Sequence, residues 1–399
     1  MNNNLLLLFV SAGSTIGILI ILLSLKEILR NAPQLKTLQH EEQSLPTTSF
    51  SVIIPTYNEE NKIKDCLISL LGNEEPCIKW EIIVIDDCST DKTVSISNEL
   101  KAEARIKSKN LQIINAGQRP KDKRWVGKNW PCWKASQEVN SDWILFIDAD
   151  VVLNKFTLER ALKQAIEEEL DLLTIAPKIE CTCLAEWMVQ PIIATLLAIG
   201  FPIEKNNSPS QKNAFAAGPF MLFKKNSYEY IGGHNKVAGE VVEDIELAKL
   251  VKNNGLRLKF VLGIDAVNVR MYSNFSNLWE GWTKNWYLGL NGNIFKAISA
   301  SLIVFWIYTI PWLIIPLATI NIALGESNYS LILMSILFAL TSLFLQYQLR
   351  KWCESKFGLP TNYWYLSGIG GFIIGFIGPA STWKTITGQG WKWKGRPLK

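Results

Sequence analysis

The stretch Trp143-Ile144-Leu145-Phe146-Ile147-Asp148-Ala149-Asp150 decides the fold. Five large apolar residues run directly into two carboxylates, a pattern typical of a central strand in a parallel sheet covered by helices on both faces. Asp148 and Asp150 then lie where the strand ends, and ligands of open α/β sheets bind outside the carboxyl ends of the strands. Neighbouring carboxylates repel each other unless a cation or hydrogen-bond donors compensate. One interpretation is a divalent metal beside an anionic substrate, and the other is an ordinary acidic turn.

The composition indicates a protein that is partly embedded in a membrane. Of the 399 residues 48% are hydrophobic and 19% charged, and the apolar residues are concentrated at the two ends. The net charge of +5 gives no signature of nucleic-acid binding. Sixteen tryptophans favour membrane–water interfaces. The seven cysteines are scattered and include no paired metal-ligand motif, so we interpret them as reduced structural thiols.

The N-terminal segment predicts a membrane anchor. Leu5 to Leu25 contains no charged residue and is long enough to cross a bilayer as a helix. Positive charges follow this segment at Lys26, Arg30 and Lys36, the reverse of a cleaved signal peptide. We therefore expect residues 1–25 to be an uncleaved anchor and residues 26–49 to be a cytoplasmic linker.

Short apolar runs alternate with helical patterns through the middle of the chain. The expected strands are Ser51–Pro55, Glu81–Ile85, Leu111–Ile114, Trp143–Ile147, Asp171–Ile175 and Phe220–Phe223. Alternation at this spacing predicts a parallel sheet with right-handed crossovers. The predicted fold class is α/β, with a doubly wound, Rossmann-like and mostly parallel sheet in one domain at residues 50–272, flanked by N- and C-terminal transmembrane helices.

Apolar segments from residue 187 onward predict further contacts with the membrane. Trp187 to Ile203 is broken by two prolines and a glutamine, which favours an interfacial segment over a span. Residues 273–297 are expected to form an amphipathic helix in the membrane interface, because aromatic residues recur there at helical spacing. This stripe comprises Phe275, Trp279, Trp282 and Trp286.

Residues 298–382 are expected to form the C-terminal membrane segments. Ser299–Leu324 and Tyr329–Leu345 are both long enough to span, and membrane helices tolerate the prolines in the first. Tyr365–Thr382 is rich in glycine, and a full crossing would leave the basic tail outside the cell. The charge rule therefore favours a re-entrant hairpin, with residues 383–399 as a basic cytoplasmic tail.

Six motifs occur in a fixed order along the chain. They are S-V-I-I-P-T-Y-N-E-E (51–60), V-I-D-D-C-S-T-D (84–91), V-G-K-N-W (126–130), F-I-D-A-D (146–150), A-A-G-P-F (216–220) and V-V-E-D (241–244). In this order they make the chain resemble the family-two inverting glycosyltransferases, which use nucleotide-diphosphate sugars. The resemblance extends from about Phe50 to Tyr287. The added motifs R-M-Y (270–272), E-G-W-T-K-N-W (280–286) and W-K-G-R (393–396) resemble membrane-bound members that glycosylate isoprenoid lipids such as carotenoids.

The resemblance implies roles for individual residues. A nucleotide pocket at the end of the first strand would be lined by Pro55, Thr56, Tyr57 and Glu59, and Asp87 would contact the base or ribose. Asp148 and Asp150 match the D-x-D motif that holds Mg²⁺ or Mn²⁺ and the sugar nucleotide, with Asp150 as the direct metal ligand. Asp244 matches the general base, with Glu243 beside it.

Elementary chemistry agrees with these roles. Departure of a nucleotide diphosphate builds negative charge, which a hard divalent cation with oxygen ligands neutralises. Inversion then needs one base to take the acceptor proton. On a helix, Glu243 and Asp244 point about 100° apart, so only one of them can aim at the acceptor. Acids also favour the first helical turn for electrostatic reasons alone, so this pair has a purely structural interpretation too.

Several other residues have two interpretations. Lys128 either pairs with the diphosphate or is an ordinary exposed lysine, and Gly218 either admits a ligand or only makes a turn. His234 follows two glycines, which favours a loop position over metal ligation. The tryptophan stripe favours a membrane anchor over a sugar platform. As an acceptor-side set we name Gly218, Trp282, Lys284 and Trp286.

These observations predict a single-transfer enzyme. It would move one sugar, a hexose, from a nucleotide-diphosphate sugar, UDP-sugar first, to a hydroxyl or carboxyl of a membrane lipid such as a carotenoid or other isoprenoid. No Q-x-x-R-W motif follows the base, which disfavours polymer synthesis. The expected location is a bacterial inner membrane with the catalytic domain in the cytoplasm.

Three alternatives stay open. The first is a non-catalytic nucleotide-sugar-binding scaffold, and the second is transfer to glycerolipid, sphingolipid or polyprenyl phosphate. The third is a nucleotidyltransferase fused to anchors, against which stands the lack of a glycine-rich phosphate loop at the first strand.

Overall fold

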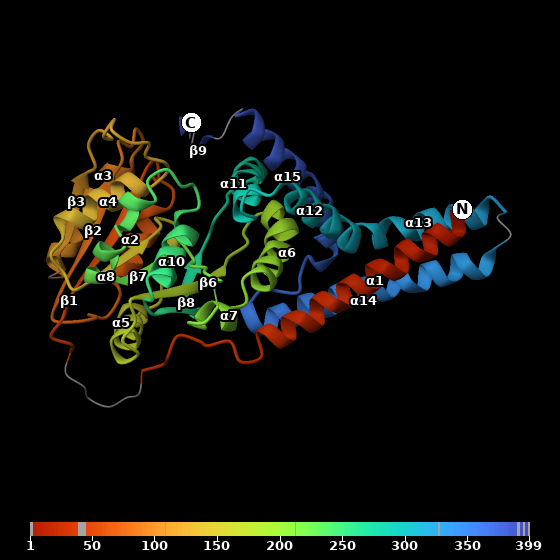
Figure 1. Cartoon of the computed structure of the whole chain (residues 1–399), viewed down its shortest axis with the longest axis horizontal. Helices are drawn as coiled ribbons and strands as arrows, with labels where there is room; N and C mark the ends of the chain where they lie inside the picture. Colours follow the sequence, from red (N-terminus) through yellow and green to blue (C-terminus); the bar gives the residue numbers. More distant parts are fainter. Residues whose placement is uncertain are drawn as a thin grey trace.

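The structure, a computed structural model, describes residues 3–38, 45–107, 109–211, 213–325, 328–388, 392–393 and 396–397. The chain forms an α/β unit that is joined to a bundle of apolar helices (Figure 1). The helices α6, α11, α12 and α15 lie between the sheet and a long arm made of α1, α13 and α14 (Figure 1). Seven residues of the predicted basic tail at 383–399 (389–391, 394–395 and 398–399) lie outside the described residues.

One mixed sheet of eight strands forms the α/β unit, in the order β3-β2-β1-β4-β7-β6-β8-β5. Its strands are β1 (Ser49–Thr56), β2 (Lys79–Asp86), β3 (Leu111–Asn115), β4 (Trp143–Ile147), β5 (Val151–Leu153), β6 (Leu172–Ile179), β7 (Phe220–Lys224) and β8 (Leu258–Val269). The first four strands in the order are parallel, and so are β6 and β8. By contrast, β7 runs antiparallel to both of its neighbours, and β5 runs antiparallel to β8.

Helices cover both faces of this sheet, because its strands are apolar on both sides. In β1, Val52 and Ile54 belong to one buried cluster and Ile53 belongs to the other, as alternation along a strand requires. The first face is covered by α2 (Ile63–Leu71), α3 (Thr93–Ile106) and α5 (Thr157–Glu167). The second face is covered by α4 (Asn129–Glu138), α8 (Lys225–Tyr230), α9 (Gly233–Lys236) and α10 (Glu243–Asn253). The doubly wound, mostly parallel fold is thus confirmed.

Two strands were not among those expected from the sequence. One is β5, which has only three residues, and the other is β8, which is the longest strand of the sheet. Gly263 and Asp265 interrupt the apolar pattern of β8, and the register between β6 and β8 shifts beside Pro177 and Lys178. Pairing with β6 along most of its length, rather than local alternation, therefore makes residues 258–269 a strand.

The core of the second face continues into the helical bundle. Buried residues of α1, α6, α11, α12, α14 and α15 belong to the same cluster as those of the sheet. The bundle consists of α1 (Asn3–Ile28), α6 (Leu184–Gly200), α7 (Ile203–Asn207), α11 (Phe275–Gly289), α12 (Ile294–Tyr308), α13 (Ile310–Ala323), α14 (Tyr329–Phe357) and α15 (Ser367–Thr387). A short turn of 3₁₀-helix (Trp364–Leu366) precedes α15, and the short strands β9 (Lys392–Trp393) and β10 (Arg396–Pro397) form a separate pair.

Among the described residues, three helices are long and apolar enough to cross a membrane. They are Asn3–Ile28, Tyr329–Phe357 and Trp364–Thr387. The predicted span at 299–324 is instead a pair of helices, α12 and α13, bent by 51°. Such a bent pair is either a broken span or a re-entrant loop. The helix α6, at 17 residues, is an apolar helix shorter than these.

The prediction of a re-entrant hairpin at 365–382 is wrong, because α15 is one continuous helix from Ser367 to Thr387. Its glycines do not form a turn; several of them let the neighbouring helix α12 approach closely. A Cβ atom on Gly375 would lie 3.0 Å from the Cβ of Phe305, and one on Gly378 would overlap the hydroxyl of Ser301. Small residues at such contacts are typical of packing between membrane helices.

The aromatic stripe of α11 is divided: Phe275 is exposed and Trp279 is partly buried, whereas Trp282 and Trp286 face the protein, which corrects the interpretation of these two as a membrane anchor. Trp282 and Trp286 are buried against other helices. The indole N–H of Trp282 donates to Gln190 of α6 at 2.8 Å, and that of Trp286 donates to the carbonyl of Ala297 at 2.9 Å. Since buried tryptophans need a partner for their N–H, these contacts fix α11 against α6 and the start of α12.

Candidate active site

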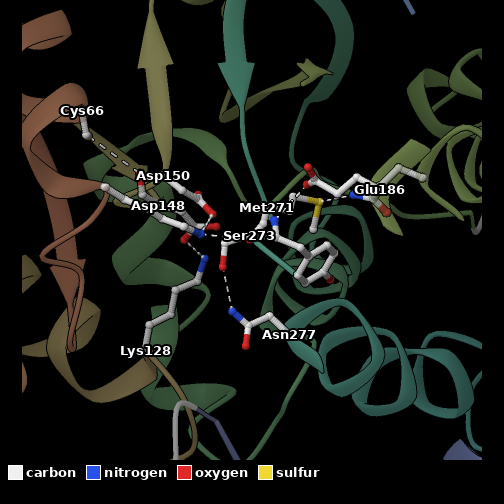
Figure 2. Close-up of polar contacts among 11 residues, drawn as sticks. Cys66, Lys128, Asp148, Asp150, Glu186, Met271, Ser273 and Asn277 are labelled. Atoms are coloured by element: carbon white, nitrogen blue, oxygen red, sulfur yellow. Dashed lines mark hydrogen bonds and ion pairs between the residues drawn. The ribbon is translucent and has the colours of Figure 1, made fainter. Parts of the chain in front are cut away.

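The two carboxylates that follow β4 lie at the carboxyl edge of the parallel strands, as predicted. Asp148 comes directly after β4, and Asp150 precedes β5. A lysine contacts each of them: Lys128 forms an ion pair with Asp148, and Lys62 forms one with Asp150 at 3.0 Å. Figure 2 shows the Lys128 side chain reaching up to Asp148. Positive charge therefore compensates both carboxylates in this structure.

Lys128 joins the D-A-D motif to the E-D motif. Its Nζ atom contacts Asp148 and also lies 3.2 Å from Oε1 of Glu243, in the first turn of α10. Burial disfavours the charge of Lys128, but Asp148 and Glu243 outweigh this effect and raise its pKa above the ordinary value. Of its two interpretations, the exposed lysine is thus excluded. One ammonium holds together two motifs that are far apart in the sequence.

Asp244 lies beside Glu243 in this cluster, and two backbone N–H groups donate to its carboxylate. Its Oδ2 atom accepts a hydrogen bond from the backbone N–H of Gly218 at 3.1 Å, and its Oδ1 atom accepts one from the N–H of Ile245 at 2.8 Å. Burial, reinforced by the charge of Glu243, raises the pKa of Asp244 to about 7. A carboxylate with a pKa near neutrality is matched to accepting a proton from a substrate.

Gly218 has a steric reason to be glycine. A Cβ atom there would lie 2.9 Å from Oδ2 of Asp244, closer than a carbon and a carboxylate oxygen can approach. Because Gly218 has no side chain, the Asp244 carboxylate can reach the Gly218 N–H and accept its hydrogen bond. This contact explains the glycine without involving a substrate, so a role for Gly218 toward an acceptor stays a prediction.

Replacing Gly218 by alanine is expected to displace the Asp244 carboxylate and to lower the transfer rate by about ten- to a hundredfold, because small misplacements of a catalytic group are costly. The measurement is kcat for sugar transfer, with thermal unfolding as a check on folding. A Cβ atom added to Gly200 would meet nothing within 4 Å, so Gly200→Ala is the matched control. Wild-type kcat in Gly218→Ala would contradict the steric argument.

The residues expected to line a nucleotide pocket lie together at the ends of β1 and β2. Pro55 and Thr56 end β1, and the Thr56 hydroxyl donates to Asp86 at 3.3 Å. Tyr57 follows directly and is buried. The N–H of Glu59 donates to the Thr93 hydroxyl at the start of α3, at 2.7 Å. The structure therefore brings this predicted set to one edge of the sheet.

Asp87 has a partner that sequence reasoning missed. Its Oδ2 atom accepts from Nη2 of Arg119 at 2.5 Å, and its N–H donates to the carbonyl of Thr56 at 2.8 Å. Arg119 also donates to the carbonyls of Trp125 and Gly127, at 2.8 and 2.9 Å. It thereby fixes the turn that presents Lys128. The only sequence signal was its position in a basic segment just before V-G-K-N-W.

Lys284 faces the same cluster from α11. Burial lowers the pKa of Lys284, while the charges of Glu243, Asp148 and Asp244 oppose this effect, so all three carboxylates lie within electrostatic range of its ammonium. Trp282 and Trp286, on either side of it in sequence, point into the helix packing. Of the four residues named for the acceptor side, Lys284 is therefore the one whose charge acts on the carboxylates.

The carboxylates fit a divalent cation that is shared with a substrate. Within the described ranges, no group of three or more His, Cys, Asp and Glu side chains is arranged to hold a metal. Asp148 and Asp150 offer only oxygen atoms, and both already hold a positive group. Mg²⁺ and Mn²⁺ take oxygen ligands, and Mg²⁺ is typically bound by one or two carboxylates together with substrate phosphates. The donor set thus suits Mg²⁺ or Mn²⁺ completed by a diphosphate.

His234 and the cysteines have structural surroundings. The His234 ring is buried, its Nδ1 atom lies 2.9 Å from the Tyr228 hydroxyl, and burial lowers its pKa to about 3. The residue lies in the short helix α9, and its neutral ring packs against Phe146. All seven cysteines are free in the structure.

The chain is similar to proteins of known activity. Residues 51–232 match the family described as glycosyl transferase family 2. The chain is 29% identical over 265 residues to 4,4'-diaponeurosporenoate glycosyltransferase of Staphylococcus haemolyticus (strain JCSC1435), covering 66% of this chain and 67% of the relative. It is 27% identical over 282 residues to the protein of the same name from Staphylococcus aureus (strain MRSA252), covering 70% of each.

A solved structure shares the fold. A mannosyltransferase from Pyrobaculum calidifontis, crystallised in complex with GDP-Man and Mn²⁺, superposes with a TM-score of 0.51 at 15% sequence identity. The superposition covers 97% of this chain and 99% of the other. The similarity therefore includes the helical bundle as well as the sheet.

Proposed function

Since residues 51–232 match the family described as glycosyl transferase family 2, we propose that the protein is an inverting, metal-dependent glycosyltransferase that moves one hexose from a nucleotide-diphosphate sugar to a carotenoid-type membrane lipid. The donor is a UDP-sugar and the cation is Mg²⁺ or Mn²⁺. The acceptor group is a carboxyl or a hydroxyl of the lipid.

One observation carries this proposal: Lys128 contacts Asp148 and Glu243 at once. This contact supports a single site that contains Asp148 and Asp150 on the donor side together with the Glu243–Asp244 pair. Inverting transfer needs this arrangement, because the diphosphate leaves one face of the anomeric carbon while the acceptor oxygen, whose proton the base takes, attacks the opposite face. A carboxylate pair without a nearby base would only bind a sugar nucleotide.

The residues divide the chemistry between them. Asp148 and Asp150 would hold the divalent cation, and the cation would neutralise the negative charge that develops on the leaving diphosphate. The Lys128 ammonium adds a fixed positive charge on the donor side, and Glu243 keeps it in place. Asp244 takes the proton of the acceptor, while the N–H groups of Gly218 and Ile245 orient its carboxylate.

The carotenoid acceptor is supported by the relatives and by the bundle. Both relatives are named for an acidic carotenoid, 4,4'-diaponeurosporenoate. The apolar helices α1, α14 and α15 would give such a lipid a path to the site from the bilayer. Lys284 offers a positive charge on that side, which suits an acceptor that ends in a carboxyl group.

A cytoplasmic catalytic domain is supported by charge at the ends of the spans. Lys26 and Arg30 follow the apolar part of α1, and Arg350, Lys351 and Lys356 lie at the end of α14 nearer the sheet. Positive residues favour the cytoplasmic side of a span. We place the sheet on the same side, in a plasma-type membrane.

The test is transfer from a panel of UDP- and GDP-hexoses to 4,4'-diaponeurosporenoate by the purified full chain in lipid nanodiscs. We expect a glycosyl ester to form in the presence of Mn²⁺ or Mg²⁺, and we expect no ester to form when EDTA removes the cation. Parallel reactions contain a hydroxylated carotenoid, a glycerolipid, a sphingolipid or a polyprenyl phosphate. Donor binding without transfer to any acceptor would instead support a non-catalytic scaffold, and transfer that persists in EDTA would contradict the metal dependence.

A further inference from the structure

Lys62 is the cation that contacts Asp150, and the mechanism above does not use it. Lys62 comes directly before α2, and its Nζ atom donates to Oδ2 of Asp150 at 3.0 Å. The same atom donates to the backbone carbonyl of Met271 at 2.9 Å. Asp150 and Met271 lie beside each other in Figure 2. Lys62 therefore links a candidate metal ligand to the segment between β8 and α11.

That segment is fixed from the bundle side. The N–H of Tyr272 donates to Oε1 of Glu186 at 3.0 Å, and Glu186, on α6, is completely buried. One turn later on α6, the side-chain amide of Gln190 contacts the Met271 sulfur at 3.2 Å. The Met271 carbonyl is thus held by its neighbours, and Lys62 lies between this carbonyl and the Asp150 carboxylate.

The two lysines of the site differ in the partners that each would retain if the aspartate that it contacts bound a metal. Lys128 would lose Asp148 but would retain a second carboxylate, Glu243. Lys62 would lose Asp150 and would retain only a neutral carbonyl. A divalent cation at Asp150 would also repel the ammonium, because like charges a few ångströms apart in a partly buried site are costly. Lys62, and not Lys128, is therefore the lysine that would be left without a carboxylate partner when a metal binds.

We propose that Lys62 is a placeholder cation. Its ammonium pairs with the Asp150 carboxylate when no donor is bound, and it leaves this carboxylate when the divalent cation binds together with the nucleotide diphosphate. The inference rests on the proposed metal-dependent function. Its consequence is that Lys62 weakens binding of the metal alone. The diphosphate brings negative charge that offsets the ammonium, so metal and nucleotide bind together better than the metal binds alone.

The experiment measures binding of Mn²⁺ alone to the full chain in detergent, by the electron paramagnetic resonance signal of free Mn²⁺. Lys62→Met removes the charge, and Lys62→Gln removes it but keeps a side chain that can donate to Asp150 and to the carbonyl of Met271. We expect both variants to bind Mn²⁺ about tenfold more tightly than the wild type. The control is Lys64→Met, an exposed position two residues further along in α2, which should stay within about twofold of the wild type.

A second titration, with UDP present, separates the outcomes. Saturating UDP should reduce the gain from Lys62→Gln to about twofold or less, because the diphosphate already offsets the ammonium. Unchanged or weaker Mn²⁺ binding in both Lys62 variants would overturn the inference while leaving the metal site in place. A wild type that binds no Mn²⁺ even with UDP would instead contradict the proposed function, and the Lys62 variants would then show whether removing the ammonium restores binding.

Discussion

Replacing Asp244 by asparagine is expected to lower the rate of sugar transfer by about a thousandfold, while the Kd of the nucleotide sugar changes little. Asparagine keeps the shape of the side chain and one acceptor atom for the N–H of Gly218, but it cannot take a proton. The prediction applies to a hydroxyl acceptor, because a carboxyl acceptor that binds in its ionised form beside Lys284 has no proton for Asp244 to take. The measurement is kcat with saturating donor and acceptor.

The pH profile of the wild type gives an independent readout of Asp244. Burial raises its pKa to about 7, so the carboxylate is mostly ionised above pH 8 and mostly protonated below pH 6. Only the ionised form can act as a base, and kcat/KM, which reports the free enzyme, should therefore fall about tenfold per pH unit below pH 6. The residual activity of Asp244→Asn should lack this dependence.

The matched control for Asp244 lies in the same helical turn. Glu246 is partly exposed and forms an ion pair with Lys249 at 2.6 Å, so Glu246→Gln should retain wild-type kcat and its pH profile. A residual rate within about tenfold of the wild type in Asp244→Asn would show that another group accepts the proton. Glu243 would then be the first candidate, because it lies beside Asp244 on α10 and contacts Lys128.

Replacing Asp150 by asparagine is expected to weaken Mn²⁺ binding by about a hundredfold and to lower kcat by about a thousandfold. The substitution removes a charged oxygen ligand and leaves the volume of the side chain unchanged. Lys62 then faces an uncharged amide, which adds to the repulsion of a divalent cation. Mn²⁺ titration and initial rates of transfer measure the two effects separately.

Asp265 provides the control for this substitution. It pairs with Arg160 at 2.7 Å, is largely exposed and lies in β8 on the surface of the sheet. Asp265→Asn should bind Mn²⁺ as the wild type does, because exposed ion pairs contribute little and this one is outside the site. Wild-type metal affinity in Asp150→Asn would mean that the cation is held by other ligands, and the assignment of the D-A-D motif would be wrong.

Local sequence patterns were sufficient where the apolar or charged character of a segment by itself decides whether the segment is buried in the sheet or lies at its edge. The apolar run before Asp148 became β4, paired with β1 on one side and β7 on the other. The motif at 51–60 and the D-A-D motif lie at one edge of the sheet, because the carboxyl ends of the parallel strands β1 and β4 meet there. The position of Asp148 and Asp150 could be predicted in this way from the sequence alone, whereas Asp244 was singled out only through the family resemblance.

Contacts between distant segments could not be obtained from these patterns. Nothing near Lys62 in sequence indicates that its ammonium reaches both Asp150 and the Met271 carbonyl. Arg119 lies in a segment without periodicity, yet it holds Asp87 and the turn before Lys128. The spacing of Trp282 and Trp286 is the same whether the stripe faces lipid or protein, and only the position of α6 and α12 decides between them.

By itself, the sequence determined that this protein has a doubly wound α/β domain with acidic residues after its central strand, and that apolar helices flank this domain. Periodicity and composition are local properties, so they are readable from the chain alone. Only the tertiary structure decided that α15 is one helix, that β8 completes the sheet, and that Lys128 joins Asp148 to Glu243. These features depend on close packing and on charges brought together from distant parts of the chain, and such pairings leave no periodic trace in the sequence.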